Sequence, residues 1–207
     1  MKNYVAALLF GINFLNPVKT SAQNIDINIL KPINQHQTAF KDAYLGFCVS
    51  SVSIINIATP VSVFADGLMK HDKQLQRDAI FMAGAYIASS IIVQGTKYIV
   101  DRNRPFVTYP FIVKRDDESG GGSFPSGHTS AAFTTATSLA LYYPKWYVIT
   151  PAYIWAVSVG WGRMYQGVHY PSDVLVGAIV GSASAWVGYK LEKKMNKKHP
   201  VATNPIL

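Results

Sequence analysis

The stretch AIFMAGAYIASSIIVQGT, residues 79–96, contains no charged side chain. Built as a helix at about 1.5 Å per residue, it can span the roughly 30 Å hydrocarbon core of a bilayer. Small residues such as Gly177 and Gly181, four positions apart, suit close packing between helices. The sequence therefore predicts an all-α fold, a polytopic membrane bundle of about five to six helices. Four more apolar stretches without the alternation of strands lie at residues 44–65, 129–143, 146–162 and 174–189.

The composition agrees with a single membrane domain and excludes several other classes. Charged residues make up 14% and hydrophobic residues 49% of the 207 residues, whereas an average soluble domain has roughly 25% charged residues. This balance excludes an intrinsically disordered chain. The single cysteine, Cys48, excludes an intrachain disulfide and cysteine-rich metal sites. The net charge of +8 does not indicate nucleic acid binding, because five of the 19 basic residues lie in the last 18 positions.

The N-terminal region has the outline of a secretory signal peptide. An apolar run from Val5 to Leu15 is followed by small residues around Ala22, where a signal peptidase would cut. An uncleaved anchor is the alternative. We therefore expect a signal peptide at residues 1–22 and a non-cytoplasmic leader segment at 23–43. A helical domain should follow at 44–190 and a basic tail at 191–207.

The basic residues predict an orientation in the membrane. With residues 23–43 outside, five spans leave the joint 66–78, the joint at Lys145 and the C-terminal tail inside. These three segments hold nine of the 19 lysines and arginines, as the positive-inside rule requires of cytoplasmic loops. We expect a protein of the bacterial inner membrane, with a soluble secreted helical protein as the alternative.

Three polar segments lie at stretch ends that this topology places outside. The first, KYIVDRNRP at residues 97–105, has Lys97 and Arg104 seven positions apart, which predicts one shared helix face. Pro105 disfavours helix at the residue before it and ends the element there. Taken alone, such a pair is more typical of cations that extend to the membrane interface.

The second segment, GGGSFPSGHT at residues 120–129, is a flexible loop that runs into the third apolar stretch. Ser126 is a natural helix N-cap, and the amides that begin at Gly127 form a ready anion site at a helix start. His128 would lie beside an anion held there. A loop with a capping serine and a solvent histidine is the plainer interpretation of this segment alone.

The third segment, GRMYQGVHYPSD at residues 162–173, joins the last two stretches. His169 and Asp173 are four positions apart, so a helix-like turn would let the carboxylate orient the imidazole. The alternative is that Asp173 caps the last helix and His169 is a surface residue.

Together the three segments gather three cations, two histidines and one carboxylate on one face. Lys97, Arg104 and Arg163 can balance the charge of a phosphate-like group, while His128 and His169 can supply an acid and a nucleophile. The sequence has no carboxylate cluster typical of magnesium or calcium and no His-Glu-x-x-His run typical of zinc. We expect neither a metal nor a cofactor.

The order and spacing of these residues resemble the three-part signature of the type 2 phosphatidic acid phosphatase superfamily, which is related to the vanadium haloperoxidases. The signature covers residues 97–173, and the flanking stretches fit the helical bundle of that family more loosely. One departure is Gly162, where the family usually has a serine before the arginine. The matching parts are Lys97-x6-Arg104-Pro105, Pro125-Ser126-Gly127-His128 and Arg163-x5-His169-x3-Asp173.

This resemblance implies a metal-independent phosphatase that forms a phosphohistidine. It implies that His169 attacks phosphorus, that Asp173 holds its ring, and that His128 protonates the leaving oxygen. The remaining signature residues would bind the phosphate, namely Lys97, Arg104, Ser126, Gly127 and Arg163.

A site at the outer membrane face suits a lipid phosphate or pyrophosphate as substrate. The expected partners are therefore such a lipid and the membrane, without nucleic acid. Nothing in the loops selects among phosphatidic acid, phosphatidylglycerol phosphate, isoprenyl pyrophosphates and lipid A phosphates. Three alternatives stay open at this point: a soluble secreted acid phosphatase, a vanadium-dependent haloperoxidase, and a membrane scaffold that binds anionic lipid through its tail lysines.

Overall fold

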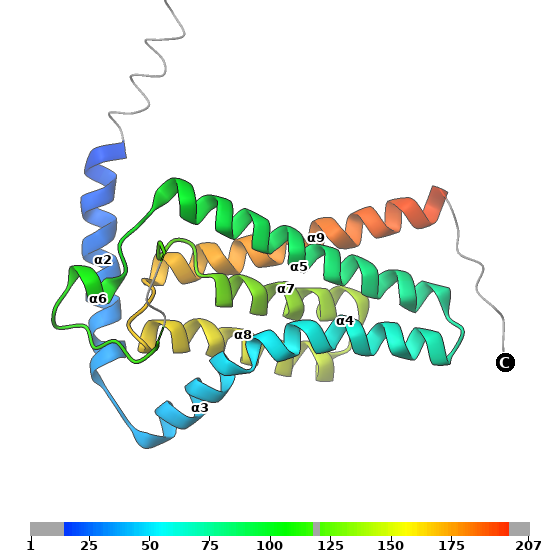
Figure 1. Cartoon of the computed structure of the whole chain (residues 1–207), viewed down its shortest axis with the longest axis horizontal. Helices are drawn as coiled ribbons and strands as arrows, with labels where there is room; N and C mark the ends of the chain where they lie inside the picture. Colours follow the sequence, from blue (N-terminus) through cyan, green and yellow to red (C-terminus); the bar gives the residue numbers. More distant parts are fainter. Residues whose placement is uncertain (1–14, 118–120, 199–207) are drawn as a thin grey trace, which may run out of the picture.

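The computed structural model describes residues 15–117 and 121–198, and within these ranges it contains helices and no strand. The predicted all-α bundle is therefore confirmed (Figure 1). In chain order the helices are α2 (Leu15–Gln35), α3 (Ala39–Ser50), α4 (Val52–Met69), α5 (Lys73–Val100), α6 (Pro105–Thr108), α7 (Gly127–Tyr142), α8 (Trp146–Tyr165) and α9 (Pro171–Lys198).

The first expected stretch, residues 44–65, forms two helices instead of one. α3 ends at Ser50 and α4 begins at Val52, while Pro60 lies inside α4. Ser51, at the junction, donates a hydrogen bond from its hydroxyl to the carbonyl of Cys48 (2.8 Å). The same hydroxyl accepts one from Nε1 of Trp155 in α8 (3.0 Å). The break is fixed by these contacts, which hydropathy does not encode.

Three helical segments among the described residues are long and apolar enough to cross a membrane, where five spans were expected. They are Val52–Met69, Lys73–Thr108 and Pro171–Lys197. α7 has only 16 residues and carries serines and threonines that are buried inside the bundle. These buried polar side chains contact other helices and not lipid.

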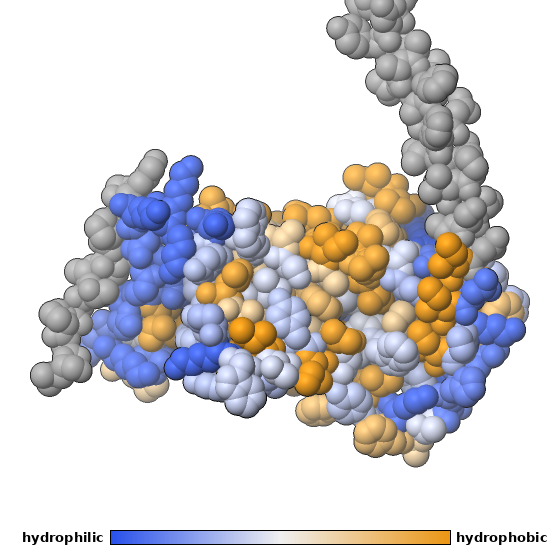
Figure 2. Space-filling model, turned by 180° about the vertical axis from the view of Figure 1, so that it is seen from behind, coloured by the Kyte–Doolittle hydropathy of each residue, from blue (hydrophilic) through white to orange (hydrophobic). Residues whose placement is uncertain are grey.

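The surface supports insertion in a bilayer. Large apolar side chains such as Ile54, Ile91 and Leu175 are more than 60% exposed. Figure 2 shows hydrophobic residues over the middle of the bundle and most hydrophilic residues toward its two ends. Because a soluble monomer rarely exposes such extensive apolar surface, this band is the part of the molecule that lipid would cover.

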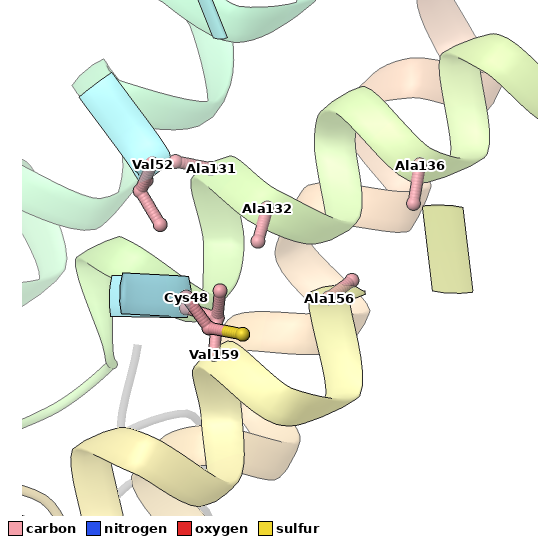
Figure 3. Close-up of a cluster of buried hydrophobic side chains, with 7 residues drawn as sticks. All are labelled: Cys48, Val52, Ala131, Ala132, Ala136, Ala156 and Val159. Atoms are coloured by element: carbon pink, nitrogen blue, oxygen red, sulfur yellow. The ribbon is translucent and has the colours of Figure 1, made fainter. Parts of the chain in front are cut away.

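The core is built from small side chains. α7 packs along α9, α8 and α5, and a Cβ atom on Gly177 would lie 2.6 Å from the carbonyl oxygen of Ser126 in the cap of α7. The small residues predicted to allow close helix contact therefore do so. One cluster of buried residues joins α3, α4, α7 and α8 (Figure 3): Cys48, Val52, Ala131, Ala132, Ala136, Ala156 and Val159.

Both ends of the described chain are more helical than the expected segments suggest. α2 runs through Ala22 and lies across the end of the bundle beside α6 (Figure 1), and Leu30 in it is fully buried. α9 continues past residue 190 to Lys198. Glu192 is buried and accepts a hydrogen bond from Nε2 of Gln74 (2.8 Å), so the first part of the expected tail packs on α5. Residues 1–14 and 199–207 lie outside the described residues, and cleavage near Ala22 stays a prediction.

Candidate active site

The predicted site residues meet at one end of the bundle. There α5 and α8 end, α7 and α9 begin, and α2 and α6 lie alongside (Figure 1). These four helix ends lie on the same side of the bundle because α5, α7, α8 and α9 alternate in direction. The chain leaves this end along α7 and returns to it along α8, which brings the three segments between residues 97 and 173 together.

The first segment contributes its two cations differently from the sequence prediction. Lys97 lies in the last turn of α5, which ends because Asp101 adopts a left-handed conformation with φ of 39°. Arg104 is therefore not on the same helix face as Lys97. It lies at the N-terminus of α6, where Pro105 keeps its backbone extended, and it is only 3% exposed.

The glycine loop holds both cations through its carbonyl groups. Nζ of Lys97 donates to the carbonyl of Gly122 (2.7 Å), and Nε of Arg104 donates to that of Gly121 (3.3 Å). Arg104 also donates from Nη1 to the carbonyl of Val168 (3.2 Å), next to His169. These contacts fix both cationic groups on the glycine loop and place Arg104 beside the turn that carries His169.

Ser126 caps α7, as its sequence context predicts. Its hydroxyl oxygen accepts from the amide of Thr129 (3.5 Å) and shares a hydrogen bond with the hydroxyl of that residue (2.9 Å). The amide of Ser126 donates to the backbone carbonyl of Asp173 (3.0 Å). The first turn of α7, starting at Gly127, is thus tied to the first turn of α9, and its amides are positioned to bind an anion.

His169 and Asp173 are brought together in the interior. Nδ1 of His169 lies 3.6 Å from Oδ2 of Asp173, and both side chains are at most 1% exposed. Hydrogen bonds of catalytic groups are often long before substrate binds and shorten in the complex. The amide of Tyr170 donates to the same Oδ2 (2.8 Å). The arrangement leaves Nε2 of the imidazole as the ring nitrogen available for chemistry.

The surroundings of His169 keep its imidazole neutral. Burial lowers its pKa below the ordinary value of 6.5, the charges of Arg163 and Arg104 lower it further, and Asp173 opposes them. A neutral imidazole has a free lone pair at physiological pH. His169 therefore has the electronic state that a nucleophile needs.

Arg163 is buried in the last turn of α8 and is held by a loop carboxylate. Its Nη1 donates to Oδ2 of Asp116 (2.6 Å) and to Oε1 of Gln166 (2.9 Å). Asp116 was not predicted as a site residue. An anion that binds at Arg163 must share this guanidinium with Asp116 or displace it.

The departure at Gly162 has a packing reason. A Cβ atom on this residue would lie 2.7 Å from Cγ2 of Val49 and 3.5 Å from Cβ of Leu45, both in α3. A serine here would require the side chain of Val49, or α3 itself, to shift. The glycine therefore permits close contact between these helices next to Arg163.

A cavity of about 230 Å³ opens between α4, α5 and α7 at this end of the bundle. Lys97, Gly127 and His128 line it, together with polar side chains that include Ser90 and Gln94. His128 is half-buried in its wall. The cavity gives a ligand access to both Lys97 and His128.

One functional candidate was missed in the sequence although it lies inside the first segment. Arg102 donates from Nη1 to Oδ1 of Asp173 (2.8 Å) and from Nη2 to Oδ2 of Asp26 in α2 (2.8 Å). The signature includes only Lys97 and Arg104 from this segment, so the sequence pattern assigned no role to Arg102. Asp26 had no sequence signal, because it lies outside the three segments.

Metal binding is not indicated by the residues that the structure describes. Within residues 15–117 and 121–198, no group of three or more histidine, cysteine, aspartate or glutamate side chains could hold a metal ion. The site is instead made of cations, helix N-terminal amides and the His169–Asp173 pair. This set of groups is suited to a phosphate.

Known proteins are similar to this chain in sequence and in fold. The chain is 31% identical over 176 residues to an undecaprenyl-diphosphatase of Sulfolobus acidocaldarius, covering 82% of this chain and 81% of that protein. It is 33% identical over 79 residues to a lipid A 4'-phosphatase of Bacteroides thetaiotaomicron, 38% of this chain and 35% of that one. Its fold matches a transmembrane PAP2 type phosphatidylglycerolphosphate phosphatase from Bacillus subtilis, with a TM-score of 0.73, 23% identity and coverage of 94% and 98%.

The family profile of the PAP2 superfamily matches residues 78–197, which is more than half of the chain and includes all three segments. The resemblance seen in the sequence is confirmed by this match and by the long alignment with the Sulfolobus protein. The chain belongs to the PAP2 superfamily.

Proposed function

We propose that this chain is a metal-independent phosphatase that hydrolyses a lipid phosphate or pyrophosphate at the outer face of the membrane, through a phosphohistidine on His169. The observation that carries the proposal is the buried pair of His169 and Asp173, 3.6 Å apart, whose histidine is under the charge of Arg104 and Arg163. A buried imidazole between a carboxylate and two arginines is arranged for attack on an anionic phosphorus centre.

In the first step, the lone pair of Nε2 of His169 attacks phosphorus, and the bond from phosphorus to the leaving oxygen breaks. Asp173, on the Nδ1 side, stabilises the imidazolium that develops. His128 in the cavity wall donates its proton to the leaving oxygen. The products of this step are the phosphohistidine and the free lipid alcohol, or a lipid monophosphate where the substrate is a pyrophosphate.

In the second step, a water molecule attacks the phosphohistidine. His128, now neutral, takes the proton from the water, and the bond between phosphorus and Nε2 breaks. Inorganic phosphate leaves and His169 is restored. Each group therefore returns to its starting state.

Lys97, Arg104, Arg163 and the amides after Ser126 would stabilise the phosphoryl group in both steps. Phosphoryl transfer depends mainly on positioning and on stabilisation of charge, and these cations can supply what metal ions supply elsewhere. Arg104 and Arg163 are almost completely buried, where their interactions with phosphate oxygens are weakly screened.

Two features support a lipid substrate. Three described helical segments have the length and composition to cross a membrane, and the cavity beside His128 is bordered by two of the helices that contain them, α4 and α5. Related proteins bear the names undecaprenyl-diphosphatase and lipid A 4'-phosphatase. The outer orientation is supported by the gathering of nine lysines and arginines in three short segments at the opposite end of the bundle, whereas Lys97, Arg104 and Arg163 at the active-site end are assigned to phosphate.

The test is phosphate release by purified protein in detergent from three substrates: a phospholipid monophosphate, an isoprenyl pyrophosphate and a soluble monoester. We expect His169→Asn to reduce release to background, because the nucleophile is lost, and EDTA to leave the wild type active. His71→Asn is the matched control, since His71 is exposed at the other end of the bundle and asparagine tolerates its positive φ of 52°. Full activity of His169→Asn, or halide oxidation that depends on added vanadate, would contradict the proposal.

A further inference from the structure

A charged network lies directly behind the catalytic pair and connects it to α2. Arg102 donates to Asp173 and to Asp26, both at 2.8 Å. Its guanidinium also stacks over the ring of Tyr170, with 3.8 Å between Cζ and the ring centroid. Asp26 is 5% exposed and Asp173 is fully buried. The guanidinium is thus held by three side chains from outside its own segment: Asp26 of α2, Asp173 of α9 and Tyr170, which directly precedes α9.

Ser172 closes the network from the start of α9. Its amide donates to Oδ1 of Asp26 (2.9 Å), and its hydroxyl donates to Oδ2 of Asp26 (2.6 Å). Nη1 of Arg102 donates to the same hydroxyl oxygen (2.7 Å). Asp26 therefore binds the N-terminus of α9, where a carboxylate is favoured by the helix dipole, one residue before Asp173.

The two oxygens of Asp173 have separate tasks in this arrangement. Oδ1 accepts from Arg102, while Oδ2 accepts from the amide of Tyr170 and faces Nδ1 of His169. A carboxylate fixed at both oxygens cannot rotate away from the imidazole. The orientation of the catalytic histidine therefore depends on Arg102 through Asp173.

The balance of charge explains the presence of Asp26. Arg102 paired with Asp173 alone would neutralise the carboxylate that must stabilise the imidazolium of His169. Asp26 binds the other nitrogen of the same guanidinium, so the three side chains together keep one net negative charge. We propose, on the basis of the function proposed above, that Arg102 and Asp26 are positioning residues that hold Asp173 in place and preserve its negative charge toward His169.

The charged groups around His169 come from several elements. Asp173 of α9, Arg163 of α8 and Arg104 before α6 act on it directly, and Lys97 of α5 and His128 of α7 line the adjoining cavity. Arg102 and Asp26 act behind Asp173. Among the residues named here, only Arg102 and Asp26 can be substituted to change the charge next to Asp173 while every group assigned to phosphate is kept.

This role makes opposite predictions for two variants. Arg102→Gln removes the positive charge beside Asp173, so the pKa of His169 should rise and the acid limb of kcat/KM should move to higher pH. Asp26→Asn removes the negative charge that offsets Arg102, so the acid limb should move to lower pH. We expect shifts of about half to one pH unit and losses in kcat of roughly 10- to 100-fold, because the imidazole is less well held.

A purely structural role in docking α2 would not give this pattern. Asn34 provides the matched control, because it fastens the same helix elsewhere, by hydrogen bonds to the carbonyls of Val113 (2.8 Å) and Tyr165 (3.0 Å). Asn34→Ala should leave the pH limb of the wild type unchanged. Arg102→Lys retains the charge but lacks the rigid planar fork that holds Asp173 and Asp26 on separate nitrogens, so it should lose kcat while its acid limb stays within about 0.3 unit of the wild type.

The experiment measures kcat/KM and kcat against pH for the full chain in detergent, with one lipid phosphate, whose own titration is common to all variants. Thermal unfolding verifies that each variant is folded. Displacement of the acid limb in opposite directions by Arg102→Gln and Asp26→Asn supports the inference. If Arg102→Gln does not fold, the acid limb of Asp26→Asn is compared with that of Asn34→Ala, and a shift to lower pH in Asp26→Asn alone supports it. Acid limbs that coincide with the wild type overturn the inference, whereas an inactive wild type or an active His169→Asn overturns the proposed function itself.

Discussion

The two histidines of the site have different surroundings, and these suit different tasks. His169 is buried and lies against Asp173, where a neutral ring with one oriented nitrogen suits a nucleophile. His128 is half-buried in the wall of the polar cavity, where it can exchange protons with a leaving group or with water. The separate roles that we propose for the two histidines follow from this difference in burial.

The role of His128 predicts a dependence on the leaving group. His128→Ala should lower kcat/KM, which reports formation of the phosphohistidine and not its hydrolysis, by roughly 10²- to 10⁴-fold for an alkyl phosphate, because an alkoxide needs a proton to leave. For p-nitrophenyl phosphate, whose leaving group is stable as an anion, the loss should be within about 10-fold. Comparison of the two substrates in the wild type and the variant measures this, and an equal loss on both would contradict a role as general acid.

At the scale of elements, α7 is the central helix, and its interior position is not evident from the sequence. It contains buried hydroxyls that bond across helices, such as Ser130 to Ser89 (2.6 Å) and Thr137 to Tyr153 (2.9 Å). Hydrogen bonds of this kind join helices in membranes. The hydropathy of residues 129–143 suggested a short span, but the polar content of α7 serves contacts to the surrounding helices.

The contact between α7 and α9 predicts a sensitive glycine. A Cβ atom on Gly181 would collide with the backbone carbonyl of Ser130, so Gly181→Ala should lower stability by about 1 to 3 kcal/mol. Gly84→Ala is the control, because no heavy atom lies within 4 Å of its added Cβ and alanine favours a helix. Thermal unfolding in detergent compares the two, and equal stability of both variants would show that the helices are less closely packed.

At the scale of the whole molecule, the bundle has two chemically different ends. The end with the candidate site gathers Lys97, Arg104 and Arg163 near the His169–Asp173 pair, while the opposite end has the turn between α4 and α5 and the lysine-rich end of α9. Figure 2 shows hydrophobic surface between them. Our proposed orientation places the active-site end outside the cell membrane.

Single cysteines at the two ends test this orientation. In a Cys48→Ala background we expect a membrane-impermeant maleimide to label Lys114→Cys in intact spheroplasts and to label Lys70→Cys only after permeabilisation. Both lysines are exposed, Lys114 near the site and Lys70 at the end of α4. The native Cys48 is 3% exposed, so its removal mainly eliminates background. The reverse labelling pattern would place the site inside.

Much of the site could be predicted because its residues occupy three segments with fixed internal spacing. The structure brings together the cations, histidines and carboxylate that these segments named, although Arg104 lies beyond the helix that holds Lys97. Asp26 and Asp116 could not be predicted, since neither lies in a motif and each meets its arginine only after folding. Their partners are separated from them by tens of residues of chain.

The sequence by itself determined the helical class, the membrane character and the residues of the three segments, because hydropathy, helix capping and motif spacing are local properties. The tertiary structure decided the division of residues 44–65 into α3 and α4, the interior place of α7, and the position of α2 across the end of the bundle. It also decided that Arg102 joins Asp26 to Asp173. These features depend on contacts between distant parts of the chain, which only packing brings within reach.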